Sequence, residues 1–393
     1  MTVPRYMAVW QKYEKKRNFI LVGCKNILIF AKSYAVSPAP STACGERLFG
    51  IFTSQRLGIA PILFFYKRSK PKFPLPSFSS DMSSSTSSTT FIPHPVSATP
   101  TCVAVYGHKC SASTAPCAMR LIREFLSVGI DVEFEEELFL HLQHDTASEA
   151  ELLERVGKFC SLPRNAAMAI SLGGDGTFLR TVEKLGRQSV PVLGINTGRL
   201  GFLADVAASE IETAVNRIAS GSYEVAQRSL IAFEAPGMPS PLYPFALNEV
   251  AVLKHDNSSL IEVETRVDGR LLTTYVADGL VVSTPTGSTG YALSAGGPIL
   301  SPDSSTLCLA PVAPHSLTMR PVVLSDDVVL RLCVKSRTGR FLVALDGRSC
   351  SMEAGREIVL RKADYSVHVV RMQGSDFFHT LRCKMMWGLD QRY

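Results

Sequence analysis

Apolar and polar positions along the chain predict two kinds of structure in succession. From residue 101 to about 205, apolar runs of strand length alternate with stretches in which apolar residues recur at helical spacing. Beyond 206, helical spacing nearly disappears and strand-like runs follow one another. This succession predicts an α/β domain over 101–205 built on a Rossmann-like parallel sheet, a β-rich domain over 206–375, and a C-terminal helix over 376–393 that returns to the first domain.

Individual elements follow from the same pattern. In the first domain we expect strands at 102–106, 132–135, 166–172 and 190–196, and helices at 116–128, 147–160 and 177–187. One more helix is expected at 209–219, and the closing helix at 377–389. Strands of the second domain are expected at 224–235, 246–254, 260–267, 271–283, 328–334, 341–345, 357–361 and 366–371. Asp268-Gly269 is a hairpin signal between two of them.

Residues 1–100 show neither pattern. They combine a basic start, an apolar patch at 19–30 that Lys25 and Asn26 interrupt, and a Ser/Thr tract at 77–90. The patch is too short and too interrupted to span a bilayer. The composition suits an organellar transit peptide better than a secretory signal. We expect a disordered, low-complexity or spurious extension, with translation starting at Met82 as the favoured alternative.

Charge is divided unevenly along the 393 residues. The net charge is +6, but residues 1–100 carry 13 Lys and Arg against 3 Asp and Glu, whereas the remainder carries 28 against 32. A mildly acidic folded part argues against a nucleic-acid binder. The ten cysteines include no Cys-x-x-Cys pair and no Cys/His cluster at zinc spacing. These observations predict a cytoplasmic protein without a metal site of its own, and no membrane partner.

Glycines follow the third predicted strand of the first domain. Gly173, Gly174 and Gly176 surround Asp175, and Thr177 opens the next helix. Glycine lets a ligand approach bare peptide groups, and a helix N-terminus favours anions, so this turn suits a phosphate-bearing ligand. A second glycine turn, at 196–198, follows the next strand, which places both turns at the carboxyl edge where open α/β sheets bind ligands. The alternative is a structural turn whose Asp caps the helix.

The β-rich half contains a second concentration of polar residues. Asn248 and Glu249 interrupt an apolar stretch. A polar pair in that position must find hydrogen-bond partners within the protein or face a ligand. Further on, Asp278 precedes a strand that leads into the Ser-, Thr- and Gly-rich segment 284–294 with its single aromatic, Tyr291. Hydroxyls could bind sugar or phosphate oxygens there, and the ring could stack on a base. The alternative is a β-loop that binds nothing.

These motifs together resemble the NAD kinase family, over roughly residues 100–393. The Gly173–Thr177 turn alone also resembles lipid kinases of the diacylglycerol and sphingosine type, and is close to a turn of phosphofructokinases. Its combination with Asn248-Glu249 and with the segment from Thr284 to Tyr291 is typical of NAD kinases. The resemblance implies an α/β domain and a β-rich domain with NAD bound between them.

The resemblance also implies roles for single residues. Asp175 is expected to be the general base. Nucleotide-binding roles are expected for Gly173, Gly174, Gly176, Thr177, Arg180, Asn248, Glu249, Asp278, Thr289, Gly290, Tyr291, Ala292, Leu293, Ser294, Asp346 and Arg348. The sequence departs from the family pattern at Arg348, where many relatives have an uncharged amide.

The implied reaction moves the terminal phosphate of ATP, another nucleoside triphosphate or polyphosphate to the 2′-hydroxyl of the adenosine ribose of NAD. The product is NADP, so the enzyme would set the cellular NAD/NADP balance. A carboxylate would accept the hydroxyl proton and a divalent cation, by default Mg²⁺, would screen the phosphates. No GxxxxGK[ST] loop is present, so phosphates and backbone groups would hold donor and metal. The remaining alternatives are a lipid kinase and a non-catalytic dinucleotide-binding regulator. A homo-oligomer is expected.

Overall fold

The computed structural model describes residues 19–24, 27–32, 100–108, 113–146, 149–198, 201–204, 206–238, 242–256, 259–374 and 377–386. The chain divides into two units, Met1–Ser88 and Thr89–Tyr393. In the first unit, β1 (Phe19–Cys24) and β2 (Ile27–Lys32) form an antiparallel hairpin in which Cys24 faces Ile27. This hairpin departs from the disorder expected over 1–100, because two apolar runs separated by two residues satisfy a hairpin pattern. The rest of that segment, Met82 included, lies outside the described residues.

A parallel sheet forms the centre of the α/β half. Its strands are β7 (Val192–Asn196), β6 (Met168–Leu172), β3 (Cys102–Tyr106), β4 (Asp131–Glu135) and β5 (Gly157–Phe159), in that order, with β8 (Val206–Ala207) beside β7. Every residue of β3, β6 and β7 is buried. Such strands need cover on both faces, which explains their continuous apolar runs.

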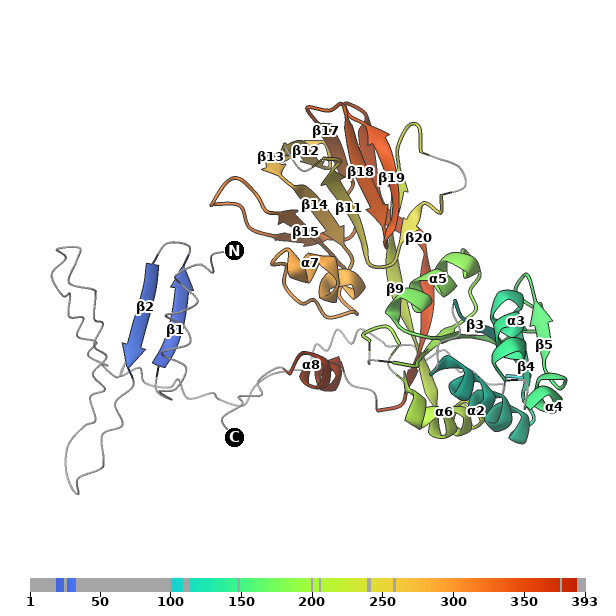
Figure 1. Cartoon of the computed structure of the whole chain (residues 1–393). Helices are drawn as coiled ribbons and strands as arrows, with labels where there is room; N and C mark the ends of the chain where they lie inside the picture. Colours follow the sequence, from blue (N-terminus) through green and yellow to red (C-terminus); the bar gives the residue numbers. More distant parts are fainter. Residues whose placement is uncertain are drawn as a thin grey trace, which may run out of the picture. The chain divides into compact units, whose positions relative to one another are not determined.

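Helices supply that cover. On one face, four helices share a core with Val103 and Val105: α2 (Thr114–Ser127), α3 (Glu136–Asp145), α4 (Ala150–Leu153) and α6 (Ile211–Ala219). The short η2 (Ala208–Glu210) precedes α6. On the other face, α5 (Asp175–Leu185) packs with Ala104 and Tyr106. Figure 1 shows α5 between this sheet and the β-rich half, with α2 and α6 on the far side. Alternate side chains of β3 point to opposite faces of the sheet, so Ala104 and Tyr106 lie on the face that α5 covers. That face is directed toward the second half.

The prediction of a helix at 147–160 is wrong. The chain enters α3 directly after β4, and the expected range holds the four-residue α4 and the edge strand β5. Leu138 and Leu142 recur at helical spacing and are fully buried, and two glutamates stand in the first turn of α3, where the helix dipole favours them.

Two sheets make the β-rich half. One is an antiparallel sheet of β16 (Val322–Ser325), β15 (Thr306–Val312), β14 (Gly279–Ser283), β11 (Glu249–Lys254), β18 (Arg340–Leu345) and β19 (Arg348–Glu353). The other begins with β13 (Arg270–Ala277), β12 (Ile261–Val267), β17 (Leu330–Lys335) and β20 (Glu357–Met372). One apolar core draws on both sheets. The strand expected at 271–283 divides at Asp278, and its two parts enter different sheets.

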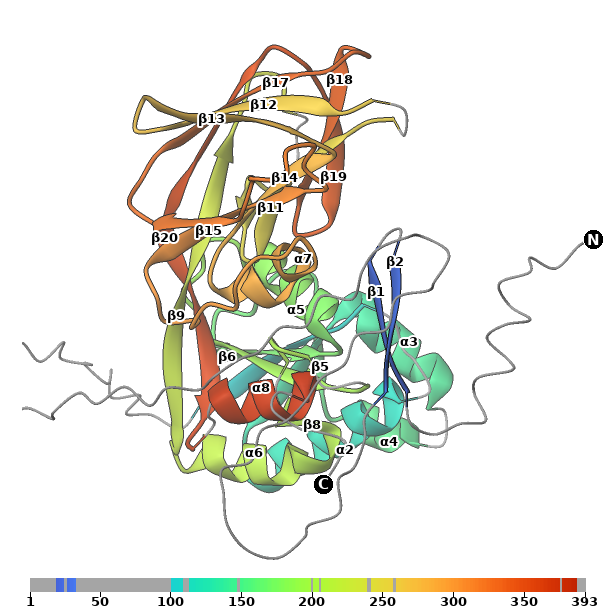
Figure 2. The same cartoon turned by 90° about the vertical axis from the view of Figure 1, so that its left-hand side faces the viewer.

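Two long strands join the halves. β9 (Tyr223–Glu234), beside which β10 (Phe245–Ala246) pairs, runs antiparallel to β20, and β20 pairs with β17 near one end and with β7 near the other. One sheet is therefore continuous from β13 to β5 (Figure 2). The runs expected at 357–361 and 366–371 are both part of β20. Because α6 shares the core of α2, the packing favours a domain boundary near the start of β9 rather than at residue 206.

The last described helix is α8 (Phe377–Met385). Its Phe377 and Thr380 line a cavity with Phe202 and Leu203, which follow β7, as expected for a helix that returns to the first half. The expected packing of Trp387 to Leu389 lies outside the described residues. No helix in the described part of the chain is long and apolar enough to cross a membrane.

Candidate active site

The glycine turn that follows β6 depends on its glycines. Gly173 has φ +154°, and a Cβ there would stand 2.3 Å from Oγ1 of Thr177. At Gly174 and Gly176 a Cβ would meet nothing within 4 Å, and both are exposed. The first glycine is therefore required by the turn itself, and the other two leave bare backbone open to a ligand at the start of α5.

Asp175 is the first residue of α5, and its carboxylate holds a loop. Oδ2 accepts the backbone N–H of Phe202 at 2.8 Å, and Oδ1 accepts those of Leu203 and Ala204 at 3.0 and 3.1 Å. At Gly201 a Cβ would lie 1.8 Å from Oδ1, so only glycine lets the loop approach. Sequence reasoning missed this loop. Its signal was the Gly-Phe-Leu-Ala run shortly after the second glycine turn.

Asp346 holds backbone N–H groups of the β-rich half with its carboxylate, as Asp175 does in the first half. Its carboxylate accepts the backbone N–H groups of Leu247, Asn248 and Glu249 at 2.7, 2.9 and 3.0 Å. The residue has φ +47° and, with Gly347 at +83°, makes the two-residue turn between β18 and β19. Burial raises the pKa of Asp346, and the three N–H groups oppose that shift. The predicted binding residue therefore positions the Asn248-Glu249 pair.

Asn248 and Glu249 hold buried polar atoms without partners. Oδ1 of Asn248 and Oε2 of Glu249 accept no hydrogen bond from the described residues. Burial and the charge of Asp346 raise the pKa of Glu249 to about 7, although a hydrogen bond from the backbone N–H of Tyr291 lowers it in part. Buried acceptors are normally satisfied, so this pair points to a ligand that donates hydrogen bonds.

The hydroxyl-rich segment packs against that pair. Oγ1 of Thr284 donates to the Leu247 carbonyl at 2.6 Å, and a Cβ at Gly287 would stand 2.1 Å from the Asn248 carbonyl oxygen. The segment continues as η3 (Thr286–Thr289) and α7 (Tyr291–Ser294). Tyr291 is exposed, which suits a stacking role. Ala292 is fully buried in a core with β14 and β15, so its side chain packs rather than faces a ligand.

Asp278 lies elsewhere. It follows β13 at the opposite end of the β11/β14 pair, where Lys254 N–H donates to its carbonyl and Lys254 Nζ pairs with its carboxylate at 2.6 Å. The five residues of β11 between Glu249 and that end span roughly 17 Å at strand rise. Within one chain, the prediction that Asp278 joins the Glu249 site is therefore wrong, because the strand separates them.

A cavity of about 570 Å³ lies between α5 and the β18–β19 turn. Its lining comprises His108, Glu137, Gly176, Leu179, Arg180, Glu183, Lys184, Asp346, Gly347 and Arg348. Arg180 is exposed and forms no hydrogen bond or ion pair within the described part of the chain. Arg348, by contrast, donates to the carbonyls of Tyr243 and Phe245 at 3.0 and 2.7 Å and lies 3.6 Å from Glu183 of α5. Arg348 thus ties α5 to the β-rich half.

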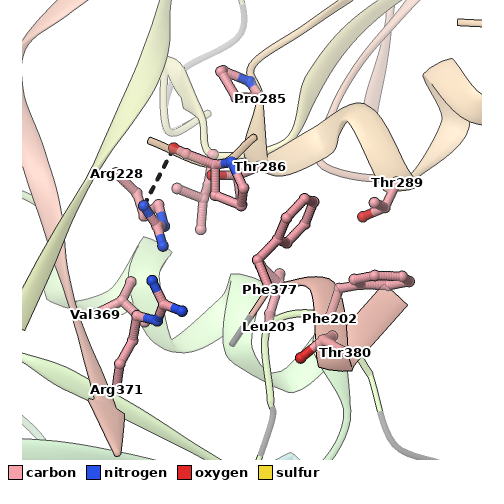
Figure 3. Close-up of a pocket in the computed structure, with 12 residues that line it drawn as sticks. Phe202, Leu203, Arg228, Pro285, Thr286, Thr289, Val369, Arg371, Phe377 and Thr380 are labelled. Atoms are coloured by element: carbon pink, nitrogen blue, oxygen red, sulfur yellow. Dashed lines mark hydrogen bonds between the residues drawn. The ribbon is translucent and has the colours of Figure 1, made fainter. Parts of the chain in front are cut away.

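A smaller cavity, of about 70 Å³, draws on both halves. Phe202 and Leu203, whose N–H groups hold Asp175, line it together with Leu247 and Thr289. Figure 3 shows Arg228 and Arg371 on one side and Phe202, Phe377 and Thr289 on the other. Arg228 is buried and donates to the Pro302 carbonyl at 3.2 Å and to Asp303 at 2.5 Å. The loops held by the carboxylates of Asp175 and Asp346 therefore meet at one cavity.

Comparison with known proteins adds family and fold matches. Residues 101–223 match the family model for the ATP-NAD kinase N-terminal domain, and residues 247–372 that for the C-terminal domain. NAD kinase of Bacteroides fragilis is 50% identical over 228 residues, 58% of this chain and 79% of that protein. NAD kinase of Christiangramia forsetii is 37% identical over 292 residues, 74% and 99% of the two chains.

Solved structures agree in fold. Yeast NADH kinase complexed with NADH matches with a TM-score of 0.67 and 24% identity, over 75% of this chain and 90% of that one. NAD kinase from Archaeoglobus fulgidus in complex with ATP matches with a TM-score of 0.57 and 27% identity, over 72% and 98%.

Proposed function

The chain belongs to the ATP-NAD kinase family, and from that premise we propose how its own residues carry out the reaction. It is an NAD kinase, a transferase that takes phosphate from ATP. Nothing in the comparisons favours a lipid kinase or a non-catalytic regulator. The observation that carries the proposal is the pair of buried acceptors without partners, on Asn248 and Glu249, beside the hydroxyl-rich segment.

NAD is the acceptor, and its adenosine ribose would lie between Asp175 and the Asn248-Glu249 pair. Ribose hydroxyls donate hydrogen bonds, which is what the unpartnered Oδ1 of Asn248 and Oε2 of Glu249 lack. Tyr291, exposed beside the pair, would stack on the base. Thr289, Gly290, Leu293 and Ser294 would line the same ligand through hydroxyl and backbone groups, as the motif implies.

Asp175 would accept the proton of the 2′-hydroxyl as the oxygen attacks the phosphoryl group. Its carboxylate is held by three N–H donors, so it keeps one position. Fixed geometry lowers the entropic cost of reaction, and the lone pair that remains on Oδ2 can accept a hydroxyl proton. The same contacts also support a purely structural role, which the test below distinguishes.

The donor triphosphate would occupy the cavity on α5. Arg180 has no partner among the described residues, and Lys184 lies one turn further along the same helix. Bare backbone at Gly174 and Gly176 adds N–H groups at a helix N-terminus. No group of three or more His, Cys, Asp or Glu gathers for a metal within the described residues. We therefore expect Mg²⁺ to enter with ATP, held largely by phosphate oxygens.

Two wider properties remain proposals. A homo-oligomer is supported by β13, the edge strand of the long sheet, where Leu271, Leu272 and Val276 are exposed. A cytoplasmic location is supported by the seven cysteines whose side chains are described, which are all free, as is usual in a reducing compartment.

Incubation of the purified protein with NAD, ATP and Mg²⁺, followed by an enzymatic assay for NADP, tests the proposal. We expect NADP to accumulate in proportion to ATP consumed. ATP consumption without NADP, or no consumption at all, would contradict it. Replacement of NAD by a diacylglycerol vesicle serves as the control for the lipid-kinase alternative, and should yield no phosphorylated lipid.

A further inference from the structure

A second large cavity, of about 630 Å³, lies between α6 and α8. Its lining includes Glu210, Arg217, His379, Thr380, Cys383 and Lys384. The proposed reaction uses none of these residues. Cys383 and His379 make this cavity unusual, because a thiol and an imidazole, both exposed, line the same space.

The two side chains are close enough for proton transfer. Nε2 of His379 lies 3.4 Å from Sγ of Cys383, one helical turn away. Arg217 and Lys384 line the cavity, and among its described lining residues the one carboxylate, on Glu210, accepts the N–H of Ala207. The thiolate is the nucleophilic form of cysteine, and an imidazole within hydrogen-bond distance can accept the proton of the thiol.

Other thiols in the described part of the chain are less suited to react. Burial raises the pKa of Cys102 and Cys308 to about 11, and it also raises the pKa of Cys117 and Cys350. Cys160 donates to Glu136, whose carboxylate raises the pKa of that thiol. Among the seven free cysteines with described side chains, Cys383 is the one with an imidazole in contact.

We propose that Cys383 is a peroxide-reactive thiol, with His379 as its base. The Cys383 thiol gives its proton to His379, and the sulfur lone pair attacks one oxygen of hydrogen peroxide. An S–O bond forms and the O–O bond breaks. Sulfur is oxidised by two electrons to sulfenic acid, and the leaving hydroxide takes the proton from His379 and departs as water. The cavity admits the peroxide and leaves room for the added oxygen.

Oxidation there would reach the loop that holds Asp175. Lys384, next to Cys383, places its ammonium 4.9 Å from the centre of the Phe202 ring. Phe377 and Thr380 of the same helix line a cavity with Phe202 and Leu203. Both loop residues donate their N–H groups to Asp175. A polar, larger sulfur group on α8 would therefore change how this helix supports the loop, and NADP formation would fall. This coupling rests on the proposed role of Asp175.

The chemistry can be tested without any activity assay. The full chain is treated with hydrogen peroxide in the presence of dimedone, which traps sulfenic acid, and labelled peptides are quantified by mass spectrometry. We expect the Cys383 peptide to label at least about tenfold faster than those of the six other described thiols. In His379→Gln the Cys383 rate should fall about tenfold. It should not change in the control His144→Gln, because His144 contacts Asp145 and none of the described thiols. Equal rates at Cys383 and Cys333, or an unchanged rate in His379→Gln, would overturn the proposal.

The coupling is measured on the same samples. NADP formation should fall at least about threefold as Cys383 becomes oxidised, and dithiothreitol should restore it. Cys383→Ser should keep its activity under peroxide, whereas Cys333→Ser should lose it as the parent does. Labelling of Cys383 with no change in NADP formation would overturn the coupling. Failure of the untreated protein to make NADP would instead contradict the proposed function and would leave the labelling result intact.

Discussion

Asp346, in the turn between β18 and β19, accepts the backbone N–H of Asn248 at 2.9 Å. β18 pairs with β11 on the side away from β14. Its two oxygens serve three N–H groups in all. Asp175 does the same for the loop that follows β7. Each half of the site is therefore held by one carboxylate that accepts three backbone donors, and the two held loops line one cavity.

Asp346→Asn should weaken both the fold and NAD binding. Asparagine has one acceptor oxygen, so at least one buried N–H would lose its partner, at a cost of about 1–3 kcal/mol. We expect a lower thermal midpoint and weaker NAD binding by calorimetry. Asp327→Asn is the matched control, because Asp327 is exposed and forms no hydrogen bond or ion pair with the described residues. Equal midpoints for the two variants would refute the positioning role.

Gly201→Ala should disturb Asp175 without changing its chemistry. The new Cβ would lie 1.8 Å from Oδ1, so the loop or the carboxylate must move. We expect kcat to fall by about a hundredfold, as for a misplaced catalytic group. In the control, Gly198→Ala, the Cβ would be 3.9 Å from its nearest neighbour, and kcat should hardly change. If both variants turn over like the parent, the loop contact has no part in catalysis.

The pKa of Glu249, raised to about 7, predicts two opposite pH effects. A carboxyl whose pKa is raised by folding stabilises the folded state at low pH, and this stabilisation is lost as pH rises through about 7. If ribose hydroxyls bind only the ionised form, NAD affinity should rise roughly tenfold between about pH 6 and pH 8. Thermal denaturation without NAD and calorimetry with it measure the two effects. In Glu249→Gln both slopes should flatten, and slopes like those of the parent would remove Glu249 from the site.

A chain that begins at Met82 should keep the midpoint and activity of the full chain. Nothing in the sequence of the first 81 residues offers a partner for the core, so their removal should cost little. The comparison uses thermal denaturation, with and without saturating NAD. At a hundredfold excess over Kd, NAD should stabilise both chains by about 2.7 kcal/mol. A midpoint several degrees lower in the shorter chain would show that the segment packs.

Periodicity predicted most of the fold, and its failures have local causes. β3, β6 and β7 were evident because strands buried on both faces are continuously apolar. The expected strands did not include β15, β16 and β19, which pair with neighbouring strands. β19 is half-buried or exposed at most positions, so no continuous apolar run marks it in the sequence. The hairpin of the first unit was not expected, because Lys25 and Asn26, which stand between its two strands, interrupt the apolar run.

The site was predicted by residue type better than by geometry. The glycine turn, Asn248-Glu249 and Tyr291 follow from local sequence. The contact of Asp175 with the 201–204 loop joins residues far apart in the chain, so no local pattern reveals it. Asp278 was misplaced because sequence order does not show that β13 and β14 enter different sheets, with Asp278 at their far end. The carbonyl partners of Arg348, 103 and 105 residues away, are likewise invisible in the sequence.

The central claim is that Asp175 accepts the proton of the ribose hydroxyl, and Asp175→Asn measures it most directly. The amide keeps the size of the carboxylate but removes proton acceptance, so single-turnover NADP formation should fall by about two to four orders of magnitude. NAD affinity by calorimetry should change far less. NADP formation within a few fold of the parent, at unchanged NAD affinity, would contradict the claim and leave Asp175 as a structural support of the loop.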